Sequence, residues 1–278
     1  MAATTGTGTI NDPYIVSEWS EFVSKCAEND VYIKIKDKTV WDMNSIHEEA
    51  FTETPLILNC ASVDGNGAEI TNVYLEDCSF IQANTAYNKK IYIYNLKILD
   101  FYETFSSSST QYFINSADSS SQLILSNVVL RGDMHNTSPS GSKKIVRGLM
   151  HRCALTLSLF GSDFKQSEYG GSRIHGLSNC NIKIYNTDST QKFIIADLYN
   201  SQVTGDFSGG LYIQLSIKSS INADIHTELT TYNTIKYTII NADKVDEGIS
   251  IPSGLIQCTD EEMHNAQAIR DKVFPIGV

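Results

Sequence analysis

From Val31 onward the chain is a succession of short apolar runs separated by polar residues. Each run has the length of a strand and is bounded by Ser, Asn, Asp or Gly, which favour turns. Between residues 31 and 257 there is no convincing segment of helical periodicity longer than two turns. The pattern therefore predicts an all-β chain. The runs are VYIKI, PLILNC, KIYIYNLKIL, QLILSNVVL, CNIKIY, KFIIADLY, GLYIQLSI and KYTII.

Both ends of the chain depart from this pattern and predict amphipathic helices. The first helix begins after Ser17, a favourable N-cap, and ends at Asn29-Asp30. Its predicted apolar face consists of Trp19, Phe22, Val23 and Cys26.

The second helix begins at a capping box formed by Thr259 and Glu262, and it continues to about Lys272 before Pro275. Its predicted apolar stripe consists of Met263, Ala266, Ile269 and Val273.

A short motif recurs between the two helices: an apolar residue, any residue, Asn or Asp, two residues and another apolar residue. The first three copies follow one another at steps of 18, and the last two are separated by a step of 21. The sequence INAD also occurs twice, at residues 221–224 and 240–243, which is a step of 19. The central residues of the motif are Asp77, Asn95, Asn127, Asn179 and Asn200, and a weaker first copy at Ile57-x-Asn59 precedes them.

A repeat of this length that contains strands fits one coil of a parallel β-solenoid. Three short strands and their turns have about the same length. Asn tolerates the left-handed backbone of a sharp bend, and its side chain can bond to the Asn of the next coil. Cys60 and Cys78, separated by the same step of 18, would stack in the same way.

An antiparallel β-sandwich with Asn at its hairpin turns is the alternative. Hairpin dipeptides are scarce, however, and DGNG at residues 64–67 is the main example. We therefore predict a single-domain, right-handed parallel β-helix. Residues 1–30 form the lead-in and a helix that covers the open first coil, residues 31–257 the β-helix, and residues 258–278 a C-terminal helix and tail.

Composition and charge restrict the partners. Hydrophobic residues make up 41% of the chain and charged residues 19%, and the net charge is −11. A surface of this sign repels nucleic acid and anionic lipid, and no apolar run is long enough to span a membrane. The N-terminus lacks the features of a secretory signal. Six scattered cysteines without metal-ligand spacing predict buried free thiols and folding in a reducing compartment.

Three features of the chain together resemble a known family: the N-terminal segment GTGT-x-x-DPY at residues 6–14, one amphipathic helix, and β-coils with Asn turns. They are similar to the pectate-lyase-like parallel β-helix proteins in the virions of tailed bacteriophages, namely head fibres and tail fibres or spikes. The tail FPIGV at residues 274–278 resembles such virion proteins as well. The resemblance implies a homotrimer that is made in the host cytoplasm without a signal peptide and is carried on the virion.

Sugar-cleaving enzymes also occur on this fold, and glycoside hydrolysis requires two carboxylates about 5–10 Å apart. The candidate pairs are drawn from Asp206, Asp224 and Asp243 in one column, and from Asp133 and Asp163 near His135 and Lys165. All of these acids occur at predicted turns or strand ends, where capping and solvation are commoner roles. Calcium-dependent lyase chemistry would require an acidic cluster beside Arg147, Arg152 or Arg173, and the sequence has none. We therefore assign no catalytic, cofactor-binding or metal-binding residue.

A locally basic region could contact an acidic partner or polysaccharide, although scattered solvated charges are the simpler interpretation. It comprises His135, Lys143, Lys144, Arg147, His151, Arg152, Lys165, Arg173 and His175.

The expected function is a non-enzymatic head or tail fibre that contacts host surface glycans through inserted loops at residues 102–122 and 135–145. A terminal segment would attach it to other virion proteins. A polysaccharide depolymerase is the first alternative, and an architectural virion joint without a ligand is the second.

Overall fold

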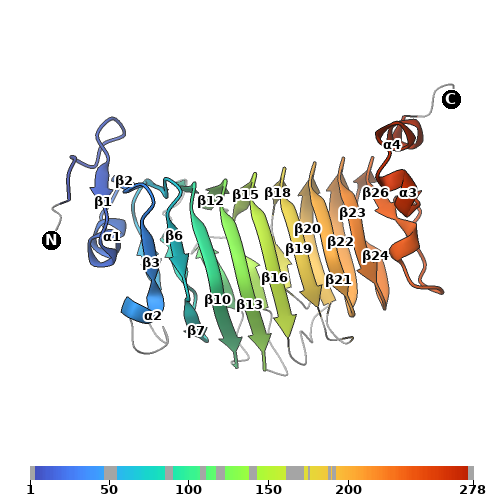
Figure 1. Cartoon of the computed structure of the whole chain (residues 1–278), viewed down its shortest axis with the longest axis horizontal. Helices are drawn as coiled ribbons and strands as arrows, with labels where there is room; N and C mark the ends of the chain where they lie inside the picture. Colours follow the sequence, from blue (N-terminus) through green and yellow to red (C-terminus); the bar gives the residue numbers. More distant parts are fainter. Residues whose placement is uncertain are drawn as a thin grey trace.

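The computed structural model describes residues 4–46, 55–84, 90–106, 111–116, 123–137, 143–160, 172–174, 176–186, 189 and 192–274. The chain is a parallel β-helix in which the strands stack along one axis into a rod (Figure 1). Helix α1 lies at one end of the rod, and α3 and α4 lie at the other. The predicted all-β parallel solenoid with a helix at each end is confirmed.

The rod has three faces, because each early coil contributes strands on three sides. Face 1 comprises β1 (Tyr14–Val16), β2 (Tyr32–Ile35), β5 (Ser62–Asp64), β9 (Ile91–Tyr94), β12 (Leu123–Ser126), β15 (Leu149–His151), β18 (Leu177–Ser178) and β25 (Ile235–Lys236). Face 2 comprises β4 (Leu56–Leu58), β8 (Ile81–Ala83), β11 (Gln111–Ser116), β14 (Lys143–Val146), β17 (Ser172–Ile174) and β24 (Glu228–Thr231). Strands β20 (Lys192–Tyr199) and β22 (Gly210–Ile217) run across both of these faces.

Face 3 is a separate sheet. It comprises β3 (Val40–Asp42), β6 (Glu69–Thr71), β7 (Tyr74–Glu76), β10 (Lys97–Phe105), β13 (Val129–Asn136), β16 (Ala154–Phe160), β19 (Asn181–Asn186), β21 (Gln202–Phe207), β23 (Ser220–Ile225), β26 (Ile239–Asn241) and β27 (Ile256–Cys258). The helical elements are α1 (Trp19–Cys26), α2 (Met43–Ile46), the 3-10 turn η1 (Ala242–Lys244), α3 (Asp260–Met263) and α4 (Ala266–Val273). In the described part of the chain, no helix combines the length and apolarity that a bilayer crossing requires.

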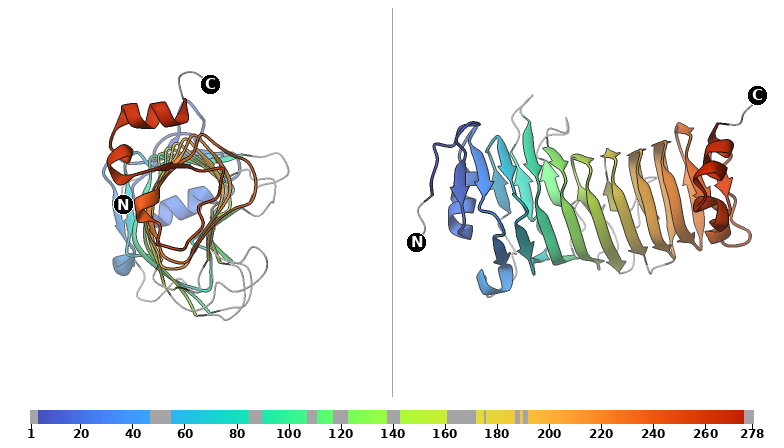
Figure 2. Two further views of the ribbon diagram at one scale, coloured as in Figure 1. Left: turned by 90° about the vertical axis from the view of Figure 1, so that its right-hand side faces the viewer. Right: turned by 45° about the horizontal axis from the view of Figure 1, so that its top comes forward.

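The coils become shorter along the rod. On face 1 the register partner of Ser62 is Tyr92, whereas near the other end the partner of Ser216 is Ile235, so the step in sequence falls by more than a third. The long coils use separate strands for faces 1 and 2, whereas β20 and β22 cover both faces with one strand each. Seen along the axis, the coils nevertheless superimpose closely (Figure 2).

The predicted Asn ladder lies at the corner between face 1 and face 3. Asn95, Asn127, Asn179 and Asn200 have left-handed backbone, with φ of 55°, 54°, 54° and 44°. Asn127 Nδ2 donates to Asn95 Oδ1 at 2.8 Å, and Asn200 Nδ2 donates to Asn179 Oδ1 at 2.5 Å. Arg152, with φ of 53°, occupies the same corner between these two pairs. The structure therefore confirms both the bend and the ladder for these four Asn residues.

The predicted series of equal steps from Asn59 through Asp77 to Asn95 is wrong. Asp77 lies at a different corner, between β7 and β8, where its N–H donates to the carbonyl of Thr104 at 2.9 Å. Asn59 lies at another corner, between β4 and β5, and its N–H donates to the carbonyl of Cys26. Asn and Asp favour turns and left-handed bends at any corner of a coil, so three different corners share one sequence motif.

Cys60 and Cys78 do not stack, because they belong to these different corners. The thiol of Cys60 instead lies beside that of Cys26, and the thiols of Cys153 and Cys180 are neighbours one coil apart. All six cysteines are free, and five of them are buried, as the sequence predicted. Burial raises the pKa of Cys26, and the hydrogen bond with Cys180 raises the pKa of Cys153.

Helix α1 covers the open first coil as predicted. Trp19, Phe22 and Cys26 are buried, and the rings of Trp19 and Phe22 pack on Trp41 of β3 with centroids 5.3 and 4.9 Å away. The indole of Trp19 also stacks on Phe80 at 6.5 Å. The helix therefore closes the apolar interior of the rod through aromatic contacts.

Two details of the predicted N-terminal helix need correction. Glu18, not Ser17, is the N-cap, and its side chain makes no capping hydrogen bond. The carbonyl of Ser17 instead accepts the indole N–H of Trp41 at 2.9 Å, which holds this residue beside the first coil. Val23 lies at the edge of the apolar stripe and is 38% exposed.

The C-terminal helix is two helices. The predicted capping box of Thr259 and Glu262 begins α3, but α3 ends at Met263. The side chain of Asn265 then accepts the N–H groups of Gln267 and Ala268 and begins α4. No residue of α3 or α4 is buried, and α4 lies beside the coil outline when the rod is viewed from this end (Figure 2). Apolar residues of the last loop pack against the core at this end instead, namely Val245, Ile249, Ile251 and Leu255.

Candidate functional site

The structure brings the predicted acidic column together at the C-terminal end of face 3. Asp206 and Asp224 are register partners on β21 and β23, and adjacent strands lie about 4.8 Å apart. Asp243 lies in η1, and its Oδ2 accepts the N–H of Asp260 at 2.7 Å. Two members of the predicted column, Asp206 and Asp224, are therefore neighbours in space, whereas Asp243 caps the start of α3.

Cations neutralise the two strand carboxylates of this column. His226 Nε2 is 3.4 Å from Asp206 Oδ1, and Lys244 Nζ is 3.7 Å from Asp224 Oδ2. A hydrogen bond to Asp246 at 3.1 Å raises the pKa of His226, which favours its cationic form. A catalytic pair needs one carboxyl group free to donate a proton and another free to attack or to activate water, whereas side chains of the chain itself engage both carboxylates here. This arrangement ties the last coils together and does not favour glycoside hydrolysis.

The other predicted acid pair is only partly described, because Asp163 lies outside the described residues. Asp133 lies on the outer side of β13, where its register partners are Tyr102 and Ser158. His135 is two positions further along the same strand. Their surroundings are described below.

The predicted basic region is not a single patch. Lys165 and His175 lie outside the described residues, as do the side chains of Lys143 and Arg173. Lys144 and Arg147 lie over the ring of Tyr112 on face 2. The remaining basic residues are on other sides of the coil: His135 is on face 3, and His151 and Arg152 are at the corner of face 1.

Four stacked rings cross the outer side of face 3, and we call them the aromatic ladder. The ring centroids are 5.3 Å apart between Tyr74 and Tyr102, 4.6 Å between Tyr102 and His135, and 4.6 Å between His135 and Phe160. The rings come from β7, β10, β13 and β16, and Tyr74 and Tyr102 are 43% and 36% exposed. The ladder is thus an apolar strip with phenol hydroxyls that runs along the rod over four strands.

A polar hollow of about 390 Å³ lies beside the ladder and shares Tyr102 with it. It forms where β10 bulges at Asp100, whose φ is 55° and where the pairing with β13 shifts by one position. Gly132 faces the bulge, and a Cβ at this position would lie 2.3 Å from the carbonyl oxygen of Phe101. The bulge and the glycine together create the hollow.

The hollow offers acidic, basic and hydroxyl groups within a small area. Arg131 clamps Asp100 through Nε at 3.2 Å and Nη2 at 2.9 and 3.0 Å. Asp133, Thr156 and Ser158 complete its polar lining. Burial lowers the pKa of His135 in the ladder, so its ring is neutral near pH 7. A polyhydroxylated ligand could therefore find hydrogen-bond donors and acceptors next to an apolar strip.

Sequence reasoning missed the aromatic ladder because it used the wrong coil length. The sequence separations of Tyr74, Tyr102 and His135 are not multiples of the predicted step of 18, so that step does not align them. One sequence signal pointed to the hollow, because Gly132 interrupts an otherwise regular strand and a glycine there often marks a bulge.

The inserted loops predicted as contact sites are partly strand. Residues 102–105 belong to β10, residues 111–116 to β11, and residues 135–136 and 143–145 to β13 and β14. Residues 107–110, 117–122 and 138–142 of these predicted loops lie outside the described residues.

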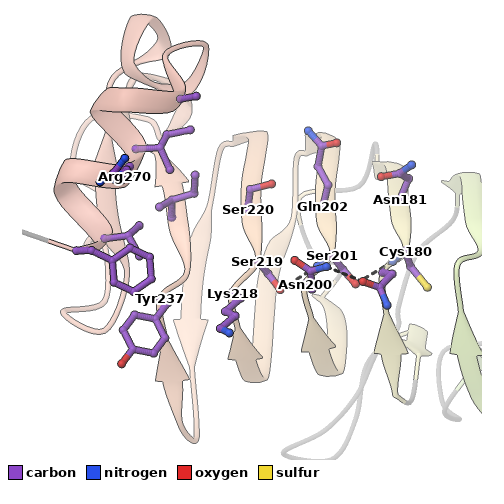
Figure 3. A pocket seen from close by; sticks show the side chains of 16 residues that line it. Cys180, Asn181, Asn200, Ser201, Gln202, Lys218, Ser219, Ser220, Tyr237 and Arg270 are labelled. Carbon is purple, nitrogen blue, oxygen red and sulfur yellow. Dashed lines mark hydrogen bonds between the residues drawn. The ribbon is translucent and has the colours of Figure 1, made fainter.

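A second concave feature lies between α4 and the corner of the last coils, and we call it the C-terminal groove (Figure 3). Its volume is about 660 Å³. Figure 3 shows Arg270 of α4 on one side and Asn200, Gln202, Lys218 and Tyr237 of the coils on the other. The rings of Tyr237 and Phe274 stack at 5.6 Å and join the two sides.

The floor of the C-terminal groove is a hydroxyl ladder that bonds to its own backbone. Ser201 Oγ accepts the N–H of Cys180 at 3.0 Å, and Ser219 Oγ accepts the N–H of Ser201 at 3.2 Å. Both hydroxyls also donate to carbonyls two positions earlier in the chain. Gln202, Lys218 and Arg270 are therefore the polar groups better placed to meet a ligand.

Within the described residues, no group of three or more His, Cys, Asp and Glu side chains is arranged to hold a metal ion. Comparisons of the chain with protein-family models, with curated proteins and with solved structures found no match. The aromatic ladder, the hollow and the C-terminal groove are the features of the described surface that indicate a function.

Proposed function

We propose that the chain is a non-enzymatic virion fibre protein of a tailed bacteriophage, and that it binds host surface glycans along face 3. The aromatic ladder beside the polar hollow is the observation that carries this proposal. An extended saccharide has apolar C–H faces and polar edges, which match an apolar strip next to carboxylate, guanidinium and hydroxyl groups.

The shape and charge of the rod support this ligand over other polymers. A single-stranded nucleic acid also stacks on aromatic rings, but it requires a positively charged groove along its backbone. The chain has a net charge of −11, and Asp100 neutralises Arg131 in the hollow. A neutral glycan meets no electrostatic penalty there. The stacked coils also place the four rings of the ladder along an extended surface, which suits a long saccharide chain.

The test of glycan binding is a comparison of two tyrosine variants on a panel of immobilised bacterial surface polysaccharides. Tyr102→Ala removes a ring of the ladder and should weaken binding at least about tenfold, since truncating an aromatic anchor of a binding site costs about 2 kcal/mol or more. Tyr92→Ala is the matched control, because Tyr92 is 41% exposed but lies on β9 of face 1. Equal losses in the two variants would contradict a site on face 3.

A depolymerase remains the alternative, because Asp206 and Asp224 have the spacing of a carboxylate pair although His226 and Lys244 engage them. We expect no release of oligosaccharide from the polysaccharides that the protein binds. If oligosaccharide is released and the release disappears in Asp206→Ala, the protein is a depolymerase and the proposal of binding without catalysis is wrong. Absence of binding to every polysaccharide in the panel would favour an architectural joint.

The oligomer and the location follow from the same proposal. A homotrimer predicts a mass of about three times 30.8 kDa by light scattering, and a monomer at micromolar concentration would refute it. Labelling virions with antibody to this protein and imaging them by electron microscopy tests the location. We expect label on the head or tail, and virions that never carry label would contradict the proposal.

A further inference from the structure

Helix α4 directs its apolar side into the C-terminal groove. Ala266, Ile269, Arg270 and Val273 line the groove, and they share one helix face because they are spaced i, i+3, i+4 and i+7. None of the residues of α4 is buried. The opposite side of the groove consists mainly of polar corner residues together with Tyr237 and Ile239, and Ile269 and Val273 remain only partly buried.

The charge in the groove is opposite to that of the whole chain. Its described lining contains two cations, Lys218 and Arg270, and no acidic residue. Neither cation forms an ion pair with another residue in the part of the chain that the structure describes. The protein as a whole has 32 acidic and 21 basic residues. A groove that contains two unpaired cations and no acidic residue is therefore complementary in charge to an anionic group.

We propose that the C-terminal groove binds an acidic peptide segment of a partner protein. Apolar side chains of the peptide would pack on Ile269, Val273 and Ala266, as an amphipathic segment packs into a groove. Its carboxylates would pair with Lys218 and Arg270 on either side. This site is on the opposite corner of the coil end from the acidic column, and it does not depend on glycan binding by face 3.

The combination of groups selects a peptide over other ligands. Two cations are too few for a nucleic-acid backbone, whose affinity comes from many phosphate contacts. A glycan would leave the aliphatic stripe of α4 facing its hydroxyl groups. An acidic peptide with apolar residues offers carboxylates to the two cations and apolar side chains to the aliphatic stripe of α4.

The probe is a short fluorescein-labelled peptide that alternates pairs of Leu with Glu, measured by fluorescence anisotropy on the full chain. Two matched peptides replace Glu with Lys, or Leu with Ser. We expect binding of the Leu/Glu peptide only, and weaker binding at about 0.5 M salt because exposed ion pairs are screened. Equal binding of the Leu/Lys peptide, or no binding of the Leu/Glu peptide at about 1 mM, would overturn the proposal.

The variant Lys218→Asn/Arg270→Gln tests the residues. Lys218 has a φ of 53°, and Asn tolerates this backbone as it does at the other corners of the same column. We expect the variant to lose about tenfold in affinity, since two exposed ion pairs each contribute up to about 1 kcal/mol. Lys36→Glu, which changes an exposed cation at the other end of the rod, should bind like the original chain. Unchanged affinity in the double variant would overturn the proposal.

Other occupants would give different results. Self-association that disappears in Lys218→Asn/Arg270→Gln would identify a second copy of this chain as the occupant and overturn the partner peptide. Peptide binding that occurs only after deletion of residues 275–278 would identify the chain's own tail and would also overturn it.

Discussion

The two ends of the rod are closed in different ways. At the N-terminal end, α1 inserts Trp19 and Phe22 against Trp41, and these contacts contain no charged group. At the C-terminal end, polar interactions hold the last segments: Asp243 accepts the N–H of Asp260, His226 pairs with Asp246, and Lys272 contacts Glu262 and the carbonyl of Gln257. Both ends carry an amphipathic helix, yet only α1 buries its apolar face.

The difference shows that amphipathicity specifies an apolar face without specifying its partner. The stripe of α1 contains two large aromatic rings, which fill the interior of the first coil. The stripe of α4 is aliphatic and includes Arg270, and at this end the loop residues Ile249, Ile251 and Leu255 already pack on the core. A helix excluded from the core is available for another molecule.

The largest expected effect comes from removing the aromatic contacts of α1. Phe22→Ala should lower the free energy of unfolding by about 3–5 kcal/mol, because the ring is 1% exposed and its loss leaves a cavity. Ile269→Ala, its counterpart in α4, should cost less than about 1 kcal/mol. Urea unfolding followed by fluorescence measures both. Similar losses would show that the two helices are equally part of the core.

The corner ladder connects the two ends, and Arg152 interrupts it. Arg152→Asn should raise the free energy of unfolding by about 0.5–1 kcal/mol, since Asn accepts the φ of 53° more readily and adds a hydrogen bond between Asn127 and Asn179. Thermal unfolding should show a small rise in Tm. The control Lys38→Asn changes a left-handed residue with a φ of 58° at the N-terminal end, outside the ladder. A larger gain in the control would contradict the role of the ladder.

Salt should distinguish the two ends in amide hydrogen exchange. At about 1 M salt we expect the amides of His226 and Asp246 to exchange several times faster, because screening weakens the ion pairs that hold this loop. The amides of α1 should not change, since aromatic packing is insensitive to screening. Faster exchange at both ends would mean that charge also holds the N-terminal cap.

The smallest expected effect is a pH dependence at His226. Its pKa is raised in the folded chain, so its contribution is complete below its unfolded pKa of about 6.5 and is lost as the pH rises through the folded value. His226→Gln should therefore lower Tm more at pH 5.5 than at pH 8. His264→Gln is the control, because the ring of His264 contacts a carbonyl and not a carboxylate. An effect of His226→Gln that does not vary with pH would exclude the ion pair as its cause.

Local sequence was sufficient for the fold class and for several of its details. Strand-length apolar runs, Asn at left-handed corners and the capping box at Thr259 are all local features, and the structure contains each of them. The strand register of the late coils was also predicted correctly, because successive late coils are separated by a short and regular number of residues. The acidic column of Asp206 and Asp224 followed from that step.

Tertiary structure decided which residues lie one coil apart in the long early coils. Insertions lengthen the early coils, where Ser62 pairs with Tyr92, so the same Asn signal at two corners led to the wrong stacking of Cys60 on Cys78.

The aromatic ladder and the hollow depend on the same long-range pairing. The ladder joins rings whose separations in sequence exceed the predicted step, and the bulge at Asp100 that opens the hollow requires Gly132 on the next strand. The sequence by itself determined the elements, since each is encoded within a short local stretch. In the long early coils, the partners of these elements were decided only by folding, because the length of a coil includes every loop between its strands.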